Sequence, residues 1–159
     1  MQRLGPLTRG GDAPALNAVI RAAVKTTCND SSCDLIGIQD GFDGLLLGRT
    51  QQAERLTPDV VCGLASRGGT ILGAANRGNP VARQVSRDGP MVMEDAATQM
   101  AQGVRQLGLD GLIVISGAGT LRIALELIER FDLSIVAAPE TVGVKPTAWR
   151  EELESCSGD

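Results

Sequence analysis

The chain has 159 residues, a formal net charge of −4 and 43% hydrophobic residues, which suits one domain with a buried core and excludes a disordered chain. It has neither an apolar run of about 18–20 residues nor a signal-like start, so we expect a cytoplasmic protein without a membrane partner. The acidic balance and the 2% of aromatic residues exclude broad nucleic-acid binding, which needs cations and stacking platforms.

The first part of the chain predicts a strand followed by an amphipathic helix. A short strand is expected at residues 3–7. Apolar residues then recur at three- and four-residue spacing over 15–24, which predicts a helix that ends near residues 28–30. Asp12 stands where its side chain can cap this helix.

The middle of the chain predicts less regular structure. A second short strand is expected at residues 35–38, and the glycine-rich stretch 40–48 is expected to form a loop. Thr57 and Pro58 are typical of a helix start, which predicts a short helix to about residue 64. Residues 74–90 are polar and contain Gly and Pro, so we interpret them as a long loop.

The last part alternates helices and strands. Helices are expected at residues 93–107 and 121–130 from the spacing of their apolar residues. The run 112–115 is continuously apolar, which is typical of a strand buried on both faces of a parallel sheet, and another buried strand is expected at 133–138. This alternation predicts an α/β fold with three layers and a doubly wound, mostly parallel sheet.

Side-chain chemistry is restricted by the absence of histidine. Without imidazole there is no Ser-His-Asp triad and no histidine-ligated metal site. The spacing of Cys28, Cys33, Cys62 and Cys156 is not convincing for zinc, so we interpret them as reduced thiols.

Glycine-rich loops at strand–helix junctions are the strongest local signs of a binding site. Residues 8–17 and 116–120 each precede a helix, where backbone N–H groups can receive a phosphate. The alternative for the first loop is a plain tight turn capped by Asp12. In the second, Thr120 can cap the helix or contact a phosphate. A third loop, at residues 67–77, contributes Arg67 and Arg77, and we expect all three to line one cleft.

Taken in order, these and other segments resemble the N-terminal half of the 6-phosphofructokinase family. The matching segments are 10–21, 41–45, 67–73, 76–80 and 110–115. The resemblance covers about residues 3–142 and predicts a phosphofructokinase-like nucleotide-binding domain over 1–142 and a divergent tail over 143–159. The family transfers a phosphoryl group from ATP, or from pyrophosphate, to fructose 6-phosphate in glycolysis and uses Mg²⁺.

The resemblance implies positions for nucleotide and effector binding. The residues at the family's nucleotide-binding positions are Gly11, Asn76, Arg77, Gly117, Ala118, Gly119 and Thr120. Gly119 in place of Asp resembles the ATP-using members. Arg21 and Lys25 stand where bacterial members place basic effector-site residues.

The departures from the family pattern predict impaired catalysis. Ala118 replaces the aspartate that handles magnesium, and an alanine side chain has no oxygen to offer a hard cation. Gly143 stands at the position of the aspartate base, with Glu140 nearby. The family's sugar-phosphate-binding half has no match here, so fructose 6-phosphate binding is also expected to fail. The alternatives are an inactive nucleotide-binding or interaction module and a product without function. The face that would meet the family's second half is expected to be exposed, which predicts a homo-oligomer or association with a longer family member.

Overall fold

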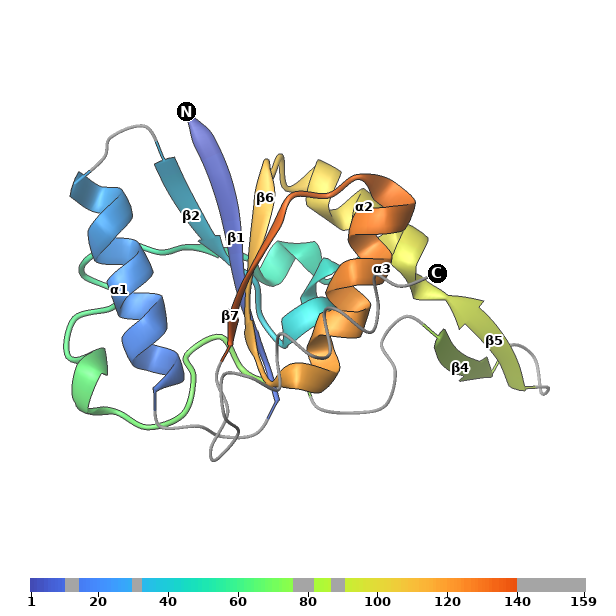
Figure 1. Cartoon of the computed structure of the whole chain (residues 1–159), viewed down its shortest axis with the longest axis horizontal. Helices are drawn as coiled ribbons and strands as arrows, with labels where there is room; N and C mark the ends of the chain where they lie inside the picture. Colours follow the sequence, from blue (N-terminus) through green and yellow to red (C-terminus); the bar gives the residue numbers. More distant parts are fainter. Residues whose placement is uncertain (11–14, 30–32, 76–81, 87–90, 140–159) are drawn as a thin grey trace.

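Figure 1 shows the computed structural model, which describes residues 1–10, 15–29, 33–75, 82–86 and 91–139. A five-stranded sheet in the order β3-β2-β1-β6-β7 runs through the centre. All neighbouring strands are parallel except β3, which pairs antiparallel with β2. The strands are β1 (Gln2–Arg9), β2 (Cys33–Gly37), β3 (Glu54–Arg55), β6 (Gly111–Ser116) and β7 (Ile135–Pro139).

Helices cover the two faces of this sheet unequally. Helix α1 (Leu16–Asn29) lies on one side, and α2 (Ala96–Gln106) and α3 (Leu121–Phe131) lie on the other (Figure 1). The helix–sheet–helix layering and the parallel sheet confirm the predicted fold class. The helix expected to start at residue 15 is confirmed as α1, and the helix expected at 121–130 is confirmed as α3.

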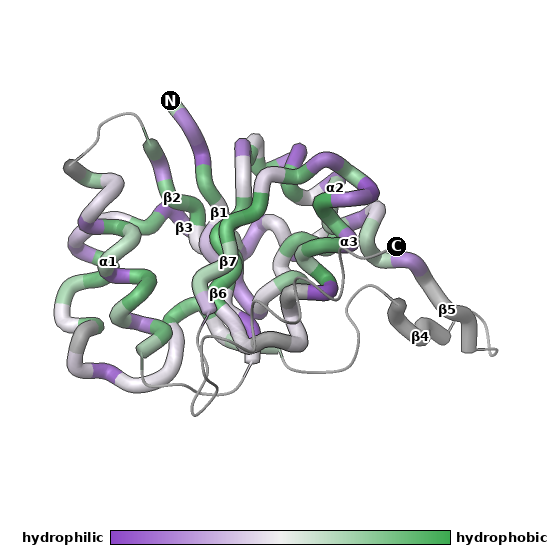
Figure 2. Tube along the Cα trace, viewed as in Figure 1, coloured by the Kyte–Doolittle hydropathy of each residue, from purple (hydrophilic) through white to green (hydrophobic). Residues whose placement is uncertain are grey.

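Two apolar clusters form the core, one on each side of the sheet. The cluster under α1 includes Ile20 and Ile115, and the cluster under α2 and α3 includes Met100 and Leu127; all four side chains are fully buried. In Figure 2 the central strands are coloured mainly as hydrophobic, as expected for strands buried on both faces. Burial of these side chains supplies the main favourable contribution to folding. The expectation that the strand at 133–138 is buried in the same way is wrong, because β7 has no fully buried residue and its Val136 is 66% exposed.

Strand β1 lies at the centre of the sheet although it contains Pro6, a residue rare in central strands. Pro6 pairs with Ile113 in register, and its carbonyl accepts a hydrogen bond from the Ile38 N–H at 2.9 Å. Proline therefore removes one backbone donor while its acceptor remains satisfied. The strand extends to Arg9, beyond the predicted end at residue 7.

Two of the expectations for the middle of the chain are wrong. The short helix expected up to residue 64 is a series of turns followed by a 3₁₀ helix at Leu64–Ser66. The stretch expected as a long loop contains β4 (Ala82–Ser86), which forms an antiparallel hairpin with β5 (Met91–Asp95). Within the predicted loop 40–48, residues Gly41–Leu45 form a 3₁₀ helix.

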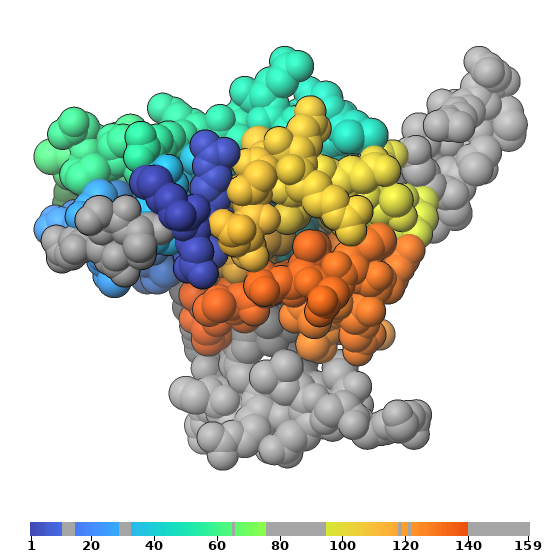
Figure 3. Space-filling view, turned by 90° about the horizontal axis from the view of Figure 1, so that it is seen from above, coloured from blue at the N-terminus to red at the C-terminus, as the bar shows by residue number. Residues whose placement is uncertain are grey.

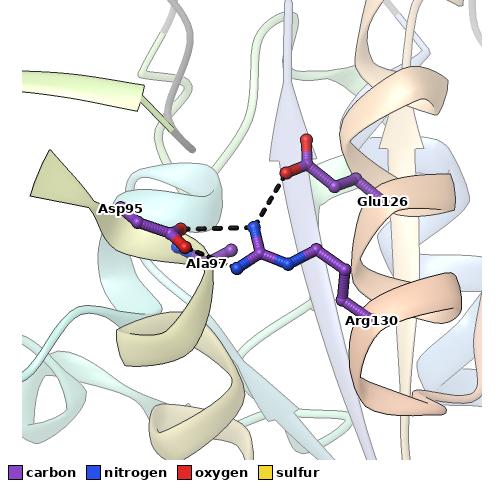
Figure 4. Close-up of polar contacts among 4 residues, drawn as sticks. All are labelled: Asp95, Ala97, Glu126 and Arg130. Carbon is purple, nitrogen blue, oxygen red and sulfur yellow. Dashed lines mark hydrogen bonds and ion pairs between the residues drawn. The ribbon is translucent and has the colours of Figure 1, made fainter. Parts of the chain in front are cut away.

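Helix α2 begins three residues later than expected because β5 occupies residues up to Asp95. The Asp95 carboxylate accepts a hydrogen bond from the Ala97 N–H at 3.0 Å and so caps the helix. Arg130, in the last turn of α3, binds Asp95 and Glu126 (Figure 4). Hydrogen bonding to Arg130 lowers the pKa of Asp95, so this contact ties the start of α2 to α3 while the carboxylate is ionised.

In the part of the chain that the structure describes, none of the helices has the length and apolar character needed to cross a membrane.

Helix α2 packs closely against the 3₁₀ helix Gly41–Leu45 at Gly103. A Cβ atom built on Gly103 would lie 2.0 Å from the carbonyl oxygen of Leu45. Two backbones can approach this closely only where no side chain intervenes. The contact brings Leu45 into the apolar cluster beneath α2.

We predict that Gly103→Ala destabilises the protein by about 1–3 kcal/mol, because the clash outweighs the better helix propensity of alanine, about 1 kcal/mol. The measurement is the midpoint of urea unfolding. Gly68→Ala is the matched control, because a Cβ there would meet nothing within 4 Å. An unchanged midpoint in Gly103→Ala would contradict this packing.

Candidate functional site

The parallel register brings the ends of three strands together at one edge of the sheet. Arg9 at the end of β1 pairs with Ser116 at the end of β6, and Ser116 pairs with Pro139 at the end of β7. The residues that follow, Gly10 and Gly117, are therefore neighbours. Ligands of open α/β sheets bind outside this carboxyl edge.

Gly10 allows the first two loops to approach each other through their backbones. Its φ angle is +122°, a region that side-chain-bearing residues rarely adopt, and a Cβ built there would lie 3.7 Å from the Gly117 backbone nitrogen. A Cβ built on Gly119 would meet nothing within 4 Å, so space is open beside the second loop. Close backbones and open space suit a bound anion.

Helices α1 and α3 both begin at this edge, directly after the two loops. Neither helix has an acidic residue in its first turn, so no carboxylate there compensates the positive end of the helix dipole. Thr120 stands at the N-cap of α3, but its side chain makes no capping hydrogen bond, so the first of its two expected alternatives is not found. Thr120 is instead buried, and its N–H donates to the Gly117 carbonyl at 3.2 Å.

The third loop is held against α1 by Asn17, whose side chain is 2% exposed. The Asn17 amide nitrogen donates to the carbonyls of Arg67 at 3.0 Å and Gly68 at 3.3 Å. Its oxygen accepts from the Ile71 N–H at 2.9 Å. A single buried amide thus binds three backbone groups in the first half of the loop.

The end of β1 holds the next part of the same loop. The Thr8 hydroxyl lies 2.9 Å from the Thr70 hydroxyl and donates to the Gly73 carbonyl at 2.6 Å. The Nε of Arg9 donates to the Ala75 carbonyl at 3.3 Å. Burial lowers the pKa of Arg9, an effect that the nearby Asp43 carboxylate opposes.

Two carboxylates at this edge were missed by the reasoning from sequence. Asp40 follows β2, donates its backbone N–H to the Leu72 carbonyl at 2.7 Å, and has its side chain 4.0 Å from Arg49. Asp43 lies near Arg9. Their position in the segment after β2, a strand that runs parallel to β1, could have indicated them from the sequence.

These contacts bring together the described parts of the three predicted loops. Gly117, Gly119 and Thr120 lie at the carboxyl edge as expected, and Ala118 lies in the 3₁₀ turn between them. Gly11, Asn76, Arg77 and Gly143, as well as the predicted cap Asp12, lie outside the described residues. Glu140 and the tail 143–159 do too.

Arg21 and Lys25 do not join this edge. They lie in the second and third turns of α1, beyond the turn that faces the loops. Their effector role stays a prediction.

A separate pocket of about 340 Å³ lies at the opposite end of the sheet, where Cys33 begins β2 and Cys28 lies near the end of α1. It contains none of the predicted site residues. The geometry of loops and helix ends, rather than this hollow, therefore locates the candidate site.

Phosphate and magnesium differ in how well they fit the carboxyl edge. Backbone N–H groups and two helix N-termini suit a phosphate. Magnesium prefers oxygen ligands, and Ala118 brings no side-chain oxygen to the loop. Across residues 1–10, 15–29, 33–75, 82–86 and 91–139, no group of three or more acidic, cysteine or histidine side chains could hold a metal. The described residues therefore fit an anion and do not by themselves fit Mg²⁺.

Comparison with known proteins identifies the family. The family model described as phosphofructokinase matches residues 3–143. The chain belongs to the phosphofructokinase family. The ATP-dependent 6-phosphofructokinase of Chloroflexus aggregans is 43% identical over 141 residues, which cover 89% of this chain and 38% of that protein.

Relatives with different phosphoryl donors are similarly close. The ATP-dependent 6-phosphofructokinase 1 of Synechocystis is 38% identical over 89% of this chain. The pyrophosphate–fructose 6-phosphate 1-phosphotransferase of Streptomyces coelicolor is 35% identical over 88% of this chain and 37% of its own length. This phosphofructokinase-family chain thus spans less than two fifths of the length of these relatives.

Solved structures agree on the fold. The phosphofructokinase of Pichia pastoris in the T-state superposes with a TM-score of 0.73 at 25% identity, covering 88% of this chain and 15% of that one. The phosphofructokinase of Saccharomyces cerevisiae gives 0.70 at 23% identity, covering 89% of this chain and 20% of that one. The described sheet is therefore a phosphofructokinase-type sheet.

We predict that Asn17→Ala loosens the third loop and destabilises the fold by about 1–3 kcal/mol, because Arg67, Gly68 and Ile71 lose the buried amide that binds their backbone groups. Hydrogen exchange of the Ile71 amide is the local measurement and urea unfolding the global one. Thr26→Ala, which removes an exposed hydroxyl bonded to the Ala22 carbonyl, is the control. Unaltered exchange of the Ile71 amide would show that the Asn17 side chain does not hold the loop.

Proposed function

We propose that this phosphofructokinase-family chain binds the phosphates of ATP at the carboxyl edge of its sheet and has lost efficient transfer to fructose 6-phosphate. The convergence of Gly10, Gly117 and the N-terminus of α3 carries the proposal, since it concentrates backbone donors and a positive helix dipole at one place. Gly11, Asn76 and Arg77 are proposed to complete the site from the adjoining loops.

The choice of ATP rests on Gly119 and on the names of the relatives. Gly119 is exposed and open, so no carboxylate repels a nucleotide's terminal phosphates at this position. Two of the relatives named above are ATP-dependent, and one uses pyrophosphate. An aspartate at position 119 would place a negative charge against the phosphate chain.

The loss of transfer rests on two positions. Phosphoryl transfer depends on positioning and on neutralising negative charge. Ala118 supplies no ligand for a magnesium ion, and Gly143 supplies no base for the sugar hydroxyl.

We predict that the wild-type chain binds ATP in a calorimetric titration and that Gly119→Asp weakens binding at least about tenfold more than Gly119→Asn. The two side chains have similar volume, and position 119 has room for either, so the difference isolates the charge. Pyrophosphate is titrated in parallel. Absence of ATP binding by the wild type, or equal losses in the two variants, would contradict the proposal.

We predict that Ala118→Asp raises the affinity for magnesium-bound ATP without restoring turnover. The new carboxylate offers an oxygen ligand to the metal, while position 143 still lacks a base. Ala118→Asn has a similar volume without the charge and is the matched control in the titration. Identical affinities in the wild type and both variants would mean that this loop does not face the metal.

We predict no measurable fructose 6-phosphate kinase activity in the wild-type chain. A general base contributes about 10²–10⁴-fold, and loss of a charge-neutralising contact costs a comparable factor. The measurement is a coupled assay of ADP release at saturating magnesium-bound ATP and sugar phosphate, with a full-length relative as positive control. Turnover within about a hundredfold of that control would overturn the prediction and direct attention to Glu140 as the base.

A further inference from the structure

Arg9 is a charged side chain that the fold buries at the carboxyl edge of the sheet. It is 8% exposed, although an arginine is rarely buried so completely unless its charge has a partner. The backbone of Gly41 packs against its side chain, since a Cβ built on Gly41 would lie 3.6 Å from the Arg9 Cβ. On the guanidinium, Nε donates to the Ala75 carbonyl at 3.3 Å. The Arg9 side chain is therefore held between the 3₁₀ helix Gly41–Leu45 and the third loop.

The sheet places Arg9 beside both of the first two loops. Strand β1 pairs with every residue of β6. Figure 3, which looks at the ends where these strands begin, shows the first residues of β1 in blue next to those of β6 in yellow. At the other ends Arg9 lies opposite Ser116. Because Gly10 follows Arg9 and Gly117 follows Ser116, Arg9 is next to one loop along the chain and next to the other across the sheet.

The side chains of Arg9 and Ser116 face the side of the sheet on which α3 begins. Residues two positions apart on a strand share a face, and Leu7 and Val114 both belong to the cluster under α2 and α3. Helix α3 starts directly after the second loop and has no acidic residue in its first turn. The guanidinium and the positive end of the α3 dipole therefore act on the same side of the sheet.

Two further polar side chains are buried at this place. Ser116 is 2% exposed, and its hydroxyl donates to the Gly117 carbonyl at 3.1 Å. Thr120 is 6% exposed, and nothing in the described part of the chain makes a hydrogen bond with its hydroxyl. A buried polar group without a partner costs free energy. An unpaired hydroxyl beside a buried cation and a helix N-terminus indicates an anion as the missing acceptor.

The charge of Arg9 persists in this environment, and Asp43 moderates it. Arginine keeps its proton in proteins. Burial lowers the pKa of Arg9, while the Asp43 carboxylate opposes this effect. The same carboxylate attracts the guanidinium, so it competes with any anion that Arg9 binds.

We propose that Arg9 binds the phosphates of ATP at this edge and supplies the positive charge that a magnesium ion would otherwise supply, so that the chain prefers metal-free ATP to magnesium-bound ATP. The inference rests on the proposed function, because the same loops hold the phosphates. A guanidinium offers several N–H donors in a geometry that matches phosphate oxygens. Metal-free ATP carries more negative charge than magnesium-bound ATP, so it gains more from a fixed cation and a helix dipole.

The carboxylates described at this edge fit a magnesium ion less well. Asp43 has the Arg9 guanidinium nearby, and the Asp40 carboxylate lies 4.0 Å from the guanidinium of Arg49. Both carboxylates therefore already have a cationic neighbour. A magnesium ion bound to the phosphates would also compete with Arg9 for the same oxygens.

The first test is a calorimetric titration of the wild-type chain with ATP in excess EDTA and with magnesium-bound ATP at the same ionic strength. We expect metal-free ATP to bind at least about fivefold more tightly. Equal or tighter binding of magnesium-bound ATP would overturn this inference and leave the proposed function standing. Absence of binding in both titrations would overturn both.

The second test asks whether Arg9 is the cation responsible. Arg9→Gln removes the charge, and we expect it to weaken binding of metal-free ATP at least about tenfold and to abolish the preference over magnesium-bound ATP. Arg9→Lys keeps the charge and is expected to keep the preference. Arg55→Gln removes the same charge from an exposed position on β3 and is the matched control. An equal loss for both forms of ATP in Arg9→Gln would indicate a structural role only and overturn the inference.

The third test keeps Arg9 in place and so does not depend on the folding of Arg9→Gln, which urea unfolding checks. Asp43→Asn removes the carboxylate that competes for the guanidinium. We expect metal-free ATP to bind about threefold more tightly or better in this variant, with a smaller gain for magnesium-bound ATP. Unchanged or weaker binding of metal-free ATP in Asp43→Asn would contradict the role given to Arg9.

Discussion

The alignment of β1 with β6 is the constraint on which the rest of the structure depends. Ladder hydrogen bonds fix Arg9 opposite Ser116, and a shift by one residue would reverse which side chains face each core cluster. Burial of Leu7 and Ile115 on opposite sides of the sheet therefore holds this register. Gly10 and Gly117 become neighbours as a consequence, and so do the loops that they begin.

Two buried polar side chains hold the third loop in place through hydrogen bonds. Thr8 and Asn17 are almost completely buried and bind backbone groups between residues 67 and 73. A buried polar group without a partner is costly, so each contact constrains the loop as well as the side chain. This explains how a segment with little regular secondary structure keeps its place beside two helix N-termini.

The family scaffold and the proposed loss of phosphoryl transfer rest on different features of this chain. The scaffold depends on the backbone and on apolar packing. Its features are the sheet register, the glycine loops and the hydrogen bonds of the buried Thr8 and Asn17, and they lie where the sequence matches phosphofructokinases. Catalysis in the proposal above depends on individual carboxylates, and Ala118 and Gly143 are the positions proposed to lack them. Binding at the edge of the sheet can therefore outlast phosphoryl transfer.

The sequence by itself determined the α/β fold, the helices α1 and α3 and the glycine loops at the carboxyl edge, because apolar periodicity and glycine act through local backbone geometry. It did not determine the hairpin of β4 and β5, whose pairing is set by register between strands. Nor did it assign Thr8, Arg9 and Asn17 to the third loop, since those hydrogen bonds join residues about 50 to 66 positions apart. Only the tertiary structure decided these contacts, because a buried polar group finds its partner through the folded arrangement and not through its sequence neighbours.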